Sequence, residues 1–305
     1  MRVHVVGNAC IDTTFRLDRL PEAGETRNAV SHADGLGGKG ANQAVAAART
    51  GAPVTLWAAI GRDGNGAWIR ETLTGEIDSA CLTEFDLPTD RSTVAVDAVG
   101  ENIILSGVSC ALAFDPLAQT KFLDTIAPDD VLVMQGNLSG VVTGACLRAG
   151  RAKGLTTILN ASPLAAGEPP EFANVDFVIV NEGEAQAISG SREPALAAAR
   201  IIESGARRVI VTLGSRGCLL LLTGINAAPV YIEAPKVSAI DTSGAGDVLC
   251  GIFAGYLARG VHPQRAIRIA VEASALAVTR PGTLSSCPTA KELSALIKTS
   301  ETEHP

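Results

Sequence analysis

The sequence predicts an α/β protein in which helices cover both faces of a mostly parallel sheet. Short apolar runs rich in β-branched residues alternate with longer Ala-rich stretches, which is the pattern of βαβ units. Hydrophobic residues make up 47% of the 305 residues, enough to bury a sizeable core. Aromatic residues contribute only 4%, as is typical when parallel strands are buried on both faces.

The expected strands and helices follow this alternation along the chain. Strands are predicted at 3–7, 54–60, 131–136, 156–161, 177–181 and 208–214. Helices that connect parallel strands are predicted at 41–50, 141–154 and 194–205, and a glycine ends each of them as a C-terminal stop. The connections are therefore long enough for parallel crossovers, and helices are expected on both faces of the sheet.

Two stretches interrupt the alternation, at 13–35 and 91–107. The second contains STVAVDAVGENIILSG, which is typical of two strands joined by a glycine-containing turn. We expect both stretches to form one small β lid. The core domain then consists of 1–12, 36–90 and 108–299, and 300–305 is expected to be a flexible tail.

Charge and cysteine content exclude several classes of protein. A net charge of −7 argues against a surface that follows nucleic acid or an anionic membrane, so neither is expected as a partner. The seven cysteines and four histidines show no metal-binding spacing, and we expect reduced thiols in a cytoplasmic protein. The chain opens directly into a predicted strand, and no apolar run reaches the ~18 residues that span a bilayer. We therefore expect a soluble protein that is not exported.

A glycine-rich segment, DGLGGKGAN, precedes the helix predicted at 41–50. Gly35, Gly37 and Gly40 match G-x-G-x-x-G, but a dinucleotide-binding fingerprint follows the first strand of its fold, and this segment does not. The sequence has no G-x-x-x-x-G-K-[ST] loop, which excludes a Walker-type NTPase. One interpretation is that Lys39 and Asn42 face a polar ligand from the first helical turn. The alternative is a helix start whose glycines only permit close packing.

A second glycine-rich segment, DTSGAGD at 241–247, precedes a long apolar helical pattern. Its small residues allow backbone N–H groups to converge at a helix N-terminus, where a phosphoryl group is stabilised. Asp247 ends the segment and can orient an acceptor hydroxyl and take its proton late in a phosphoryl transfer. Because a carboxylate is a weak base toward an alcohol, positioning is its larger contribution. The alternative is an ordinary capping aspartate, which does not need the glycines.

Two more polar segments lie at the carboxyl ends of predicted strands. Open α/β sheets bind their ligands at these ends. NEGE begins at Asn181, and Asn181 and Glu184 can hold magnesium through water. TLGSRG follows another strand, and Gly214 and Gly217 allow a nucleotide to approach the backbone. Each segment is equally well explained as an ordinary helix start or turn, so the hypothesis depends on the whole set.

In this order the segments resemble those of the ribokinase family of sugar kinases, also called the PfkB carbohydrate kinases. The resemblance runs almost from end to end and includes GNACID, GGKGANQAVAAARTGA, MQGN, LNASP, NEGEA, VTLGSRG, DTSGAGD and AVTRPGTLSSCP. GGKGAN followed later by DTSGAGD is its most specific part. It implies a three-layer αβα sandwich with a small β lid. It also implies an ATP-dependent phosphotransferase that acts on a primary hydroxyl of a small sugar, with ribose as the first candidate.

The resemblance implies a role for each matching position. Asp247 would be the catalytic base, and the amides of Gly244, Ala245, Gly246 and Asp247 would form the anion hole. The residues expected to bind the sugar are Asp12, Gly38, Lys39, Asn42, Asn137 and Asp247. The residues expected to hold ATP are Asn181, Glu184, Thr212, Gly214, Ser215 and Gly217, with Glu184 contacting Mg²⁺ through water. An activating monovalent cation, K⁺, is expected mostly on carbonyls of Asp241, Ser243, Ala277, Arg280, Gly282 and Ser286.

Three departures from the family pattern lie in the expected sugar pocket. Cys10 takes the place of an asparagine, Asn137 that of a sugar-contacting glutamate, and residues 109–111 (Ser-Cys-Ala) that of Gly-Ala-Asn. Such exchanges of donors and acceptors change which hydroxyl pattern is satisfied. The acceptor therefore stays open between ribose, another pentose, a ketohexose such as fructose, and a nucleoside.

Two further expectations concern catalysis and assembly. A sugar-binding regulator without activity is the alternative from another class, but such a protein is expected to lose Asp247 or the anion hole first, and both are intact. The lid strands carry an apolar face in VAVDAVGENIIL, so a homodimer through the lid is predicted.

Overall fold

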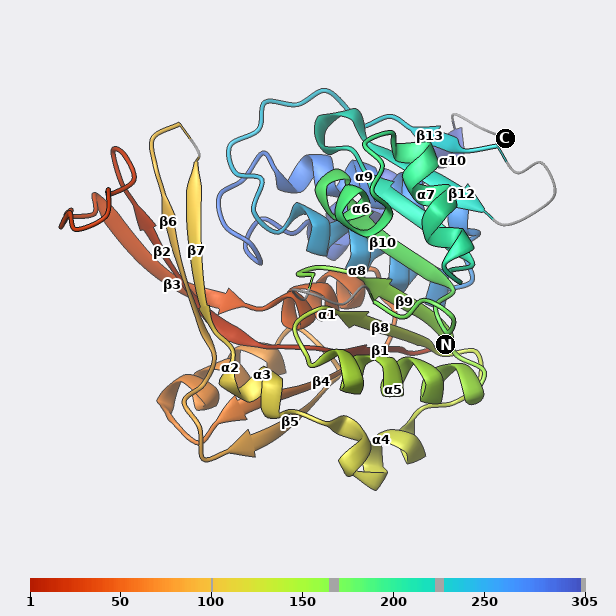
Figure 1. Cartoon of the computed structure of the whole chain (residues 1–305), viewed down its shortest axis with the longest axis horizontal. Coiled ribbons are helices and arrows are strands. Elements are labelled where there is room, and N and C mark those ends of the chain that lie inside the picture. Colours follow the sequence, from red (N-terminus) through yellow and green to blue (C-terminus); the bar gives the residue numbers. More distant parts are fainter. Residues whose placement is uncertain (100, 165–169, 223–227, 303–305) are drawn as a thin grey trace.

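The computed structural model describes residues 1–305 except 100, 165–169, 223–227 and 303–305, and it describes only the backbone of 102 and 298–302. Within these residues nine strands form a central sheet and four form a second, smaller sheet (Figure 1). The strands of the central sheet are, in spatial order, β13 (Val230–Ile232), β12 (Cys218–Leu222), β11 (Arg208–Thr212), β10 (Phe177–Asn181), β9 (Thr156–Asn160), β8 (Val131–Gln135), β1 (Val3–Val6), β4 (Val54–Gly61) and β5 (Ser79–Phe85). All neighbours from β11 to β5 are parallel, whereas β12 and β13 are antiparallel additions at one edge.

Helices cover both faces of the central sheet, which gives three layers. One face packs against α1 (Lys39–Arg49), α2 (Gly64–Thr74), α8 (Ala245–Ala258), α9 (Pro263–Ala277) and α10 (Ala290–Thr302). The other face packs against α3 (Ser109–Ala113), α4 (Thr120–Thr125), α5 (Gly140–Ala152), α6 (Glu182–Ser189) and α7 (Pro194–Glu203). Each face has its own apolar core, so the strands are buried on both sides, as the lack of alternation in their sequences predicted.

The predicted α/β fold is confirmed, and the six predicted strands correspond to β1, β4, β8, β9, β10 and β11. The three predicted connecting helices correspond to α1, α5 and α7. A glycine with positive φ follows each of them, at Gly51, Gly154 and Gly205. Strands β5, β12 and β13 were not predicted. The tail predicted from residue 300 overlaps the end of α10, and 303–305 lie outside the described residues.

The second sheet, called the lid here, is formed by two separate pieces of chain (Figure 1). Its strands are β3 (Ser31–Gly37), β2 (Cys10–Arg16), β6 (Arg91–Val96) and β7 (Asn102–Gly107), in that spatial order. Its first piece begins at Cys10 and ends at Gly37, so it extends beyond the predicted range 13–35 at both ends. The expected turn between β6 and β7 includes residue 100, which lies outside the described residues.

The lid has two faces, because side chains alternate along each strand. The cleft face carries Asp12 and Arg16, and Nη2 of Arg16 lies 3.8 Å from Oδ2 of Asp241 in the core. The outer face carries apolar residues of the paired strands β2, β6 and β7. A groove of about 550 Å³ on this face is lined by Phe15, Leu17, Pro21, Arg27, Asn28, Ala29, His32 and Ala95.

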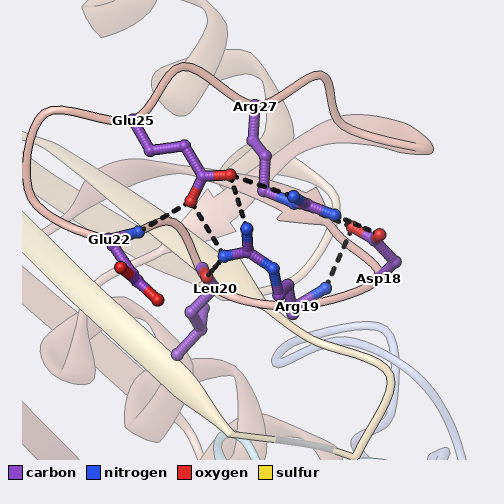
Figure 2. A network of polar contacts seen from close by, with 6 residues as sticks. All are labelled: Asp18, Arg19, Leu20, Glu22, Glu25 and Arg27. Atoms are coloured by element: carbon purple, nitrogen blue, oxygen red, sulfur yellow. Dashed lines mark hydrogen bonds and ion pairs between the residues drawn. The ribbon is translucent and has the colours of Figure 1, made fainter.

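The loop between β2 and β3 forms one wall of this groove, and a network of charged residues holds it (Figure 2). Arg19 donates two hydrogen bonds to Glu25, at 2.6 and 2.8 Å, and Arg27 pairs with Asp18 and contacts Glu25. The bonds from Arg19 lower the pKa of Glu25 to about 2, so this carboxylate stays ionised in ordinary buffers. The network lies at the surface, with Arg27 and Glu25 partly covered, and salt is expected to screen it.

Candidate active site

The carboxyl ends of four neighbouring strands place polar side chains at one edge of the central sheet. β8 ends at Gln135 and β9 at Asn160, and the strand register pairs these two residues directly. β10 and β11 end at Asn181 and Thr212, which are also paired. Because the strands are parallel, all four side chains lie at the same edge, where open α/β sheets bind their ligands.

The DTSGAGD segment meets this edge as the first turn of α8. Gly244 is the N-cap with φ of 76°, a left-handed conformation that favours glycine, and in the described part of the chain α8 has no side-chain cap. A Cβ atom at Gly244 would lie 3.1 Å from Cα of Thr283, so the loop also packs closely there. The first-turn amides of Ala245 and Gly246 have no carbonyl partner inside the helix, although the Ala245 amide makes a long bond of 3.4 Å to the Thr242 carbonyl before it. They form an N-terminus that can stabilise an anion.

Asp247 lies in this first turn, but its carboxylate is turned toward α1. It is 6% exposed. Nδ2 of Asn42 donates to its Oδ2 at 3.2 Å, and Nε2 of Gln43 donates to its Oδ1 at 2.9 Å. Nζ of Lys39 lies 3.9 Å from Oδ1. The side chain is therefore not an ordinary helix cap, and the two glycine-rich segments form a single site.

The glycines of the first segment allow this approach, so the close-packing interpretation of GGKGAN applies, and a ligand on Lys39 and Asn42 stays a prediction. A Cβ atom at Gly40 would lie 2.7 Å from the backbone nitrogen and oxygen of Asn8, and Gly38 adopts φ of 92° at the N-cap of α1. On the other side of α1, a Cβ atom at Gly251 of α8 would lie 2.4 Å from the Gln43 carbonyl oxygen. Close packing brings the polar face of α1 within reach of Asp247.

The cleft face of the lid contributes Asp12 to the same region. Sγ of Cys10 donates to Oδ1 of Asp12 at 3.3 Å, and Cys10 also contacts Ser92. Burial raises the pKa of Asp12, and the nearby charge of Asp247 raises it further. Burial also raises the pKa of the Cys10 thiol, which therefore stays protonated. This part of the site offers one carboxylate and a weakly hydrogen-bonding thiol.

Two buried acceptors of the predicted sugar-binding residues have no hydrogen-bond partner among the residues that the structure describes. They are Oδ1 of Asn42 and Oδ1 of Asn137. Asn42 lies on α1 beside Asp247, whereas Asn137 follows the end of β8. A buried acceptor without a partner is costly, so such atoms are candidates for a substrate hydroxyl.

The predicted nucleotide-binding residues lie at the ends of β10 and β11. Asn181 and Glu184 form a capping box at the start of α6, with hydrogen bonds of 2.8 and 2.9 Å. Gly214 has φ of 59° and Gly217 φ of 94° in the turn that contains Ser215, after Thr212. A Cβ atom at Gly217 would lie 1.9 Å from the Ile232 carbonyl oxygen, so this glycine is required by the β12–β13 hairpin. The capping box and Gly217 thus have structural roles beside any role with ATP.

The predicted cation site consists of two loops joined by Asp241. Its carboxylate accepts hydrogen bonds from the amides of Ser243, at 2.9 Å, and Gly282, at 3.0 Å. Burial opposes ionisation of Asp241, but these bonds outweigh it and lower its pKa. The Ala277 carbonyl accepts from the Arg280 amide at 3.0 Å. Oγ of Ser286, another predicted ligand, donates to the carbonyl of Thr283 at 2.8 Å.

Three residues of the site were not predicted from the sequence: Gln43, Gln135 and Asn160. All are buried, and Gln43 contacts both of the others. The signal for them is present in the sequence, because each is an amide side chain next to or inside an apolar run. A buried amide requires hydrogen-bond partners, so such residues indicate an internal polar network.

The geometry defines a phosphotransferase site, with an anion-binding helix N-terminus, a buried carboxylate and a polar strand edge. Over residues 2–290 the chain matches the family described as pfkB family carbohydrate kinase. It therefore belongs to the PfkB family of carbohydrate kinases and is a phosphotransferase that acts on a sugar hydroxyl, with ATP as the donor.

Three similar proteins illustrate the breadth of this relationship. The chain is 32% identical to ribokinase of Mus musculus, over 95% of this chain and 93% of that protein. It is 29% identical to deoxyribokinase of Salmonella typhi, over 99% of this chain and all of that protein. The structure of Arabidopsis thaliana ribokinase complexed with ribose and ATP has a TM-score of 0.86 and 26% identity, over 97% of this chain and 98% of that chain. Among the described residues, none of the helices has the length and apolar character needed to cross a membrane.

Proposed function

We propose that this kinase transfers the γ-phosphoryl group of ATP to a primary hydroxyl of a small sugar, with D-ribose as the first candidate. The observation that carries the proposal is the position of Asp247. This buried carboxylate lies in the same helical turn as the anion-binding amides and is held by donors from α1. One helix turn therefore offers both parts that the transfer requires, an orienting carboxylate and a site for negative charge.

The other predicted residues support a bound sugar between the lid and α1. Asp12 can accept hydrogen bonds from two sugar hydroxyls, and the unpartnered Oδ1 of Asn42 can accept a third. Lys39 lies beside Asp247 and can donate to a sugar oxygen. The sugar oxygen then attacks the γ-phosphorus while the bond to the ADP leaving oxygen breaks. The hydroxyl proton passes to Asp247 late in the reaction.

A second candidate acceptor is 2-deoxyribose, and one observation favours it. Cys10 lies against Asp12, and its buried thiol is a weak donor and a weak acceptor. A pocket with a thiol at this place suits a sugar that lacks one hydroxyl better than a pocket with an amide does. The similarity to a deoxyribokinase supports the same candidate. Another pentose, fructose and a nucleoside remain the further alternatives.

A coupled assay of ADP release decides between these acceptors. Ribose, 2-deoxyribose, other pentoses, fructose, polyols and nucleosides are tested at equal concentration with Mg²⁺ and K⁺ present. We expect the highest kcat/KM for ribose or 2-deoxyribose. A hexose or nucleoside with a higher kcat/KM would overturn the assignment to a pentose, and no ADP release with any acceptor would overturn catalysis.

The residues present fit ATP with magnesium. The capping box uses Oε2 of Glu184, and Oε1 can accept a hydrogen bond from a water molecule of hydrated Mg²⁺. In the described part of the chain, nothing lies within 4 Å of a Cβ atom built on Gly214, so a ligand can approach this backbone. Thr212 and Ser215 add hydroxyls to the same turn. Magnesium would supply charge neutralisation on the phosphates.

We expect potassium to stimulate the activity. Asp241 is ionised and joins the two loops whose carbonyls are the candidate ligands, so a monovalent cation there would stabilise the start of α8. The measurement compares kcat in KCl, NaCl and choline chloride at one ionic strength, which removes general screening as a cause. Equal kcat in the three salts would contradict the cation site.

We further propose a homodimer through the outer face of the lid. Leu105 is 67% exposed, and Ile103 on the same face is also exposed. Two lids that pack together would bury these residues and the free edges of the small sheet. Leu105→Asp is expected to shift the protein to a monomer in sedimentation velocity. The control is Val141→Asp on α5, where another exposed apolar residue, 82% accessible, lies outside the lid strands. Dimers that persist in Leu105→Asp would contradict this interface.

A further inference from the structure

Beneath Asp247 lies a string of three buried amide side chains, Gln43, Asn160 and Gln135. Nε2 of Gln43 donates to Oδ1 of Asp247 at 2.9 Å and to Oδ1 of Asn160 at 3.0 Å. Oε1 of Gln43 accepts from Nε2 of Gln135 at 2.9 Å. Gln43 and Gln135 are 0% exposed. All polar atoms of Gln43 are therefore used in the interior of the protein.

The hydrogen bond that Asn160 makes to β10 determines which atom is the donor and which the acceptor in every other bond of this string. Nδ2 of Asn160 donates to the carbonyl oxygen of Ile179 at 3.2 Å, and a carbonyl can only accept. Asn160 must therefore present its Oδ1 to Gln43, so that Gln43 must present its NH₂ group. Its remaining atom, Oε1, then faces the NH₂ group of Gln135. The backbone of β10 thus determines which end of Gln43 faces the carboxylate.

This direction has a chemical consequence for Asp247. Oδ1 faces the amide donor of Gln43 and the Lys39 ammonium group, whereas Oδ2 faces only the amide of Asn42 among the described residues. Because two donor groups face Oδ1 and one faces Oδ2, Oδ2 retains a free lone pair for the sugar hydroxyl.

We propose that Gln43 is a positioning residue, which fixes the orientation of the Asp247 carboxylate and directs its Oδ2 to the acceptor hydroxyl. This inference rests on the proposed role of Asp247. In the transfer, the sugar O–H proton moves to Oδ2 as the new O–P bond forms and the bond to ADP breaks. Gln43 itself neither gains nor loses a proton. Gln135 donates to Oε1 of Gln43, and its own Oε1 is unpartnered in the described part of the chain.

Two variants of Gln43 test the proposal. Gln43→Met keeps the length of the side chain but removes the donor, and we expect kcat to fall about 10- to 100-fold with the sugar KM changed less than about threefold. Gln43→Glu replaces the donor with a carboxylate. A second negative charge beside Asp247 favours its protonation, so the acid limb of the kcat profile is expected to move up by about one pH unit or more.

Other titratable groups also face Asp247, and their effects on the pH profile must be separated from that of Asp247. These are Lys39 on α1, Asp12 on the lid and Cys250 on α8. Burial raises the pKa of the Cys250 thiol, and this thiol stays neutral through the tested range. The acid limb is therefore measured at saturating sugar, where an effect of Asp12 on binding no longer limits the rate.

The control separates positioning from stability. Thr50→Val removes another buried polar group, at the C-cap of α1, where it bonds to the carbonyl of Ala47 away from the site. This variant is expected to change thermal stability but not kcat. If Gln43→Met and Gln43→Glu fold and keep the kcat and the acid limb of the unmodified enzyme, the proposal is wrong. Should Asp247→Asn retain turnover, the proposed role of Asp247 itself fails, whereas no ADP release with any acceptor would overturn the proposed function. An inactive Asp247→Asn with fully active Gln43 variants overturns the inference about Gln43 alone.

Discussion

Asp247→Asn is expected to lower kcat by about 10²–10⁴-fold, the usual range for loss of a positioned acid–base group. The asparagine keeps the size of the side chain, and its Oδ1 can still accept from Gln43. It cannot take the proton of the sugar hydroxyl, and its NH₂ group faces the amide of Asn42. The variant therefore loses proton transfer and the orientation of the hydroxyl together, whereas the lid and the anion-binding amides remain.

Single-turnover phosphorylation measures this loss, and calorimetric titration with the sugar measures binding separately. We expect the Kd of the sugar to change only a few fold, since Asp12, Lys39 and Asn42 remain. The matched control is Asp130→Asn, which alters another buried carboxylate. Asp130 directly precedes β8, at the amino-terminal end of the parallel strands, and bonds to His4. That control is expected to lose stability but to keep kcat. A turnover of Asp247→Asn close to that of the unmodified enzyme would remove Asp247 from the mechanism.

The central architecture could be predicted because local and long-range signals agree in it. Strands β8 and β10 are continuous apolar runs, and a parallel strand buried on both faces requires such a sequence. The start of α8 was predictable for a different reason. A glycine with positive φ, followed by small residues and a carboxylate, restricts the backbone so strongly that few other structures fit.

Edge strands and the lid boundaries could not be predicted in the same way. β5 pairs with β4 alone and is only partly buried, so its sequence, SACLTEF, lacks a continuous apolar signal. β12 is fully apolar, but whether such a run pairs parallel or antiparallel depends on the short turn before it. The lid begins at Cys10, where β2 starts. The first residues of β2 are buried like those of a core strand, so the sequence does not mark the boundary between core and lid.

The polar string under Asp247 could not be predicted because its members are distant in the chain. Gln43, Gln135 and Asn160 come from α1, β8 and β9, and only the order of the strands brings them together. Lys39 and Asn42 were predicted because they belong to a motif with a direct chemical meaning. A buried amide that contacts only other protein groups has no such motif, and its role follows from the direction of its hydrogen bonds.

Gly37→Ala is expected to raise the sugar KM by about 10- to 150-fold with little change in kcat. A Cβ atom at this position would lie 2.0 Å from Cγ of Asp12 and 2.2 Å from each of its carboxylate oxygens. The backbone φ of Gly37 is not in the left-handed region, so an alanine fits the strand itself. The carboxylate of Asp12 must rotate away, because it is the movable partner in this contact. Loss of a charge-assisted hydrogen bond of about 1.5–3 kcal/mol gives the expected change in KM.

Gly35→Ala on the same strand is the matched control. Gly35 pairs directly with Asp12 in the lid sheet, but nothing in the described part of the chain lies within 4 Å of a Cβ atom built there. We expect this variant to keep the sugar KM, and thermal unfolding of both variants checks that the lid is intact. The two variants differ in whether the added methyl group displaces the Asp12 carboxylate. A KM that stays unchanged in Gly37→Ala would show that Asp12 does not bind the sugar, and the acceptor would then have to be held by α1 alone.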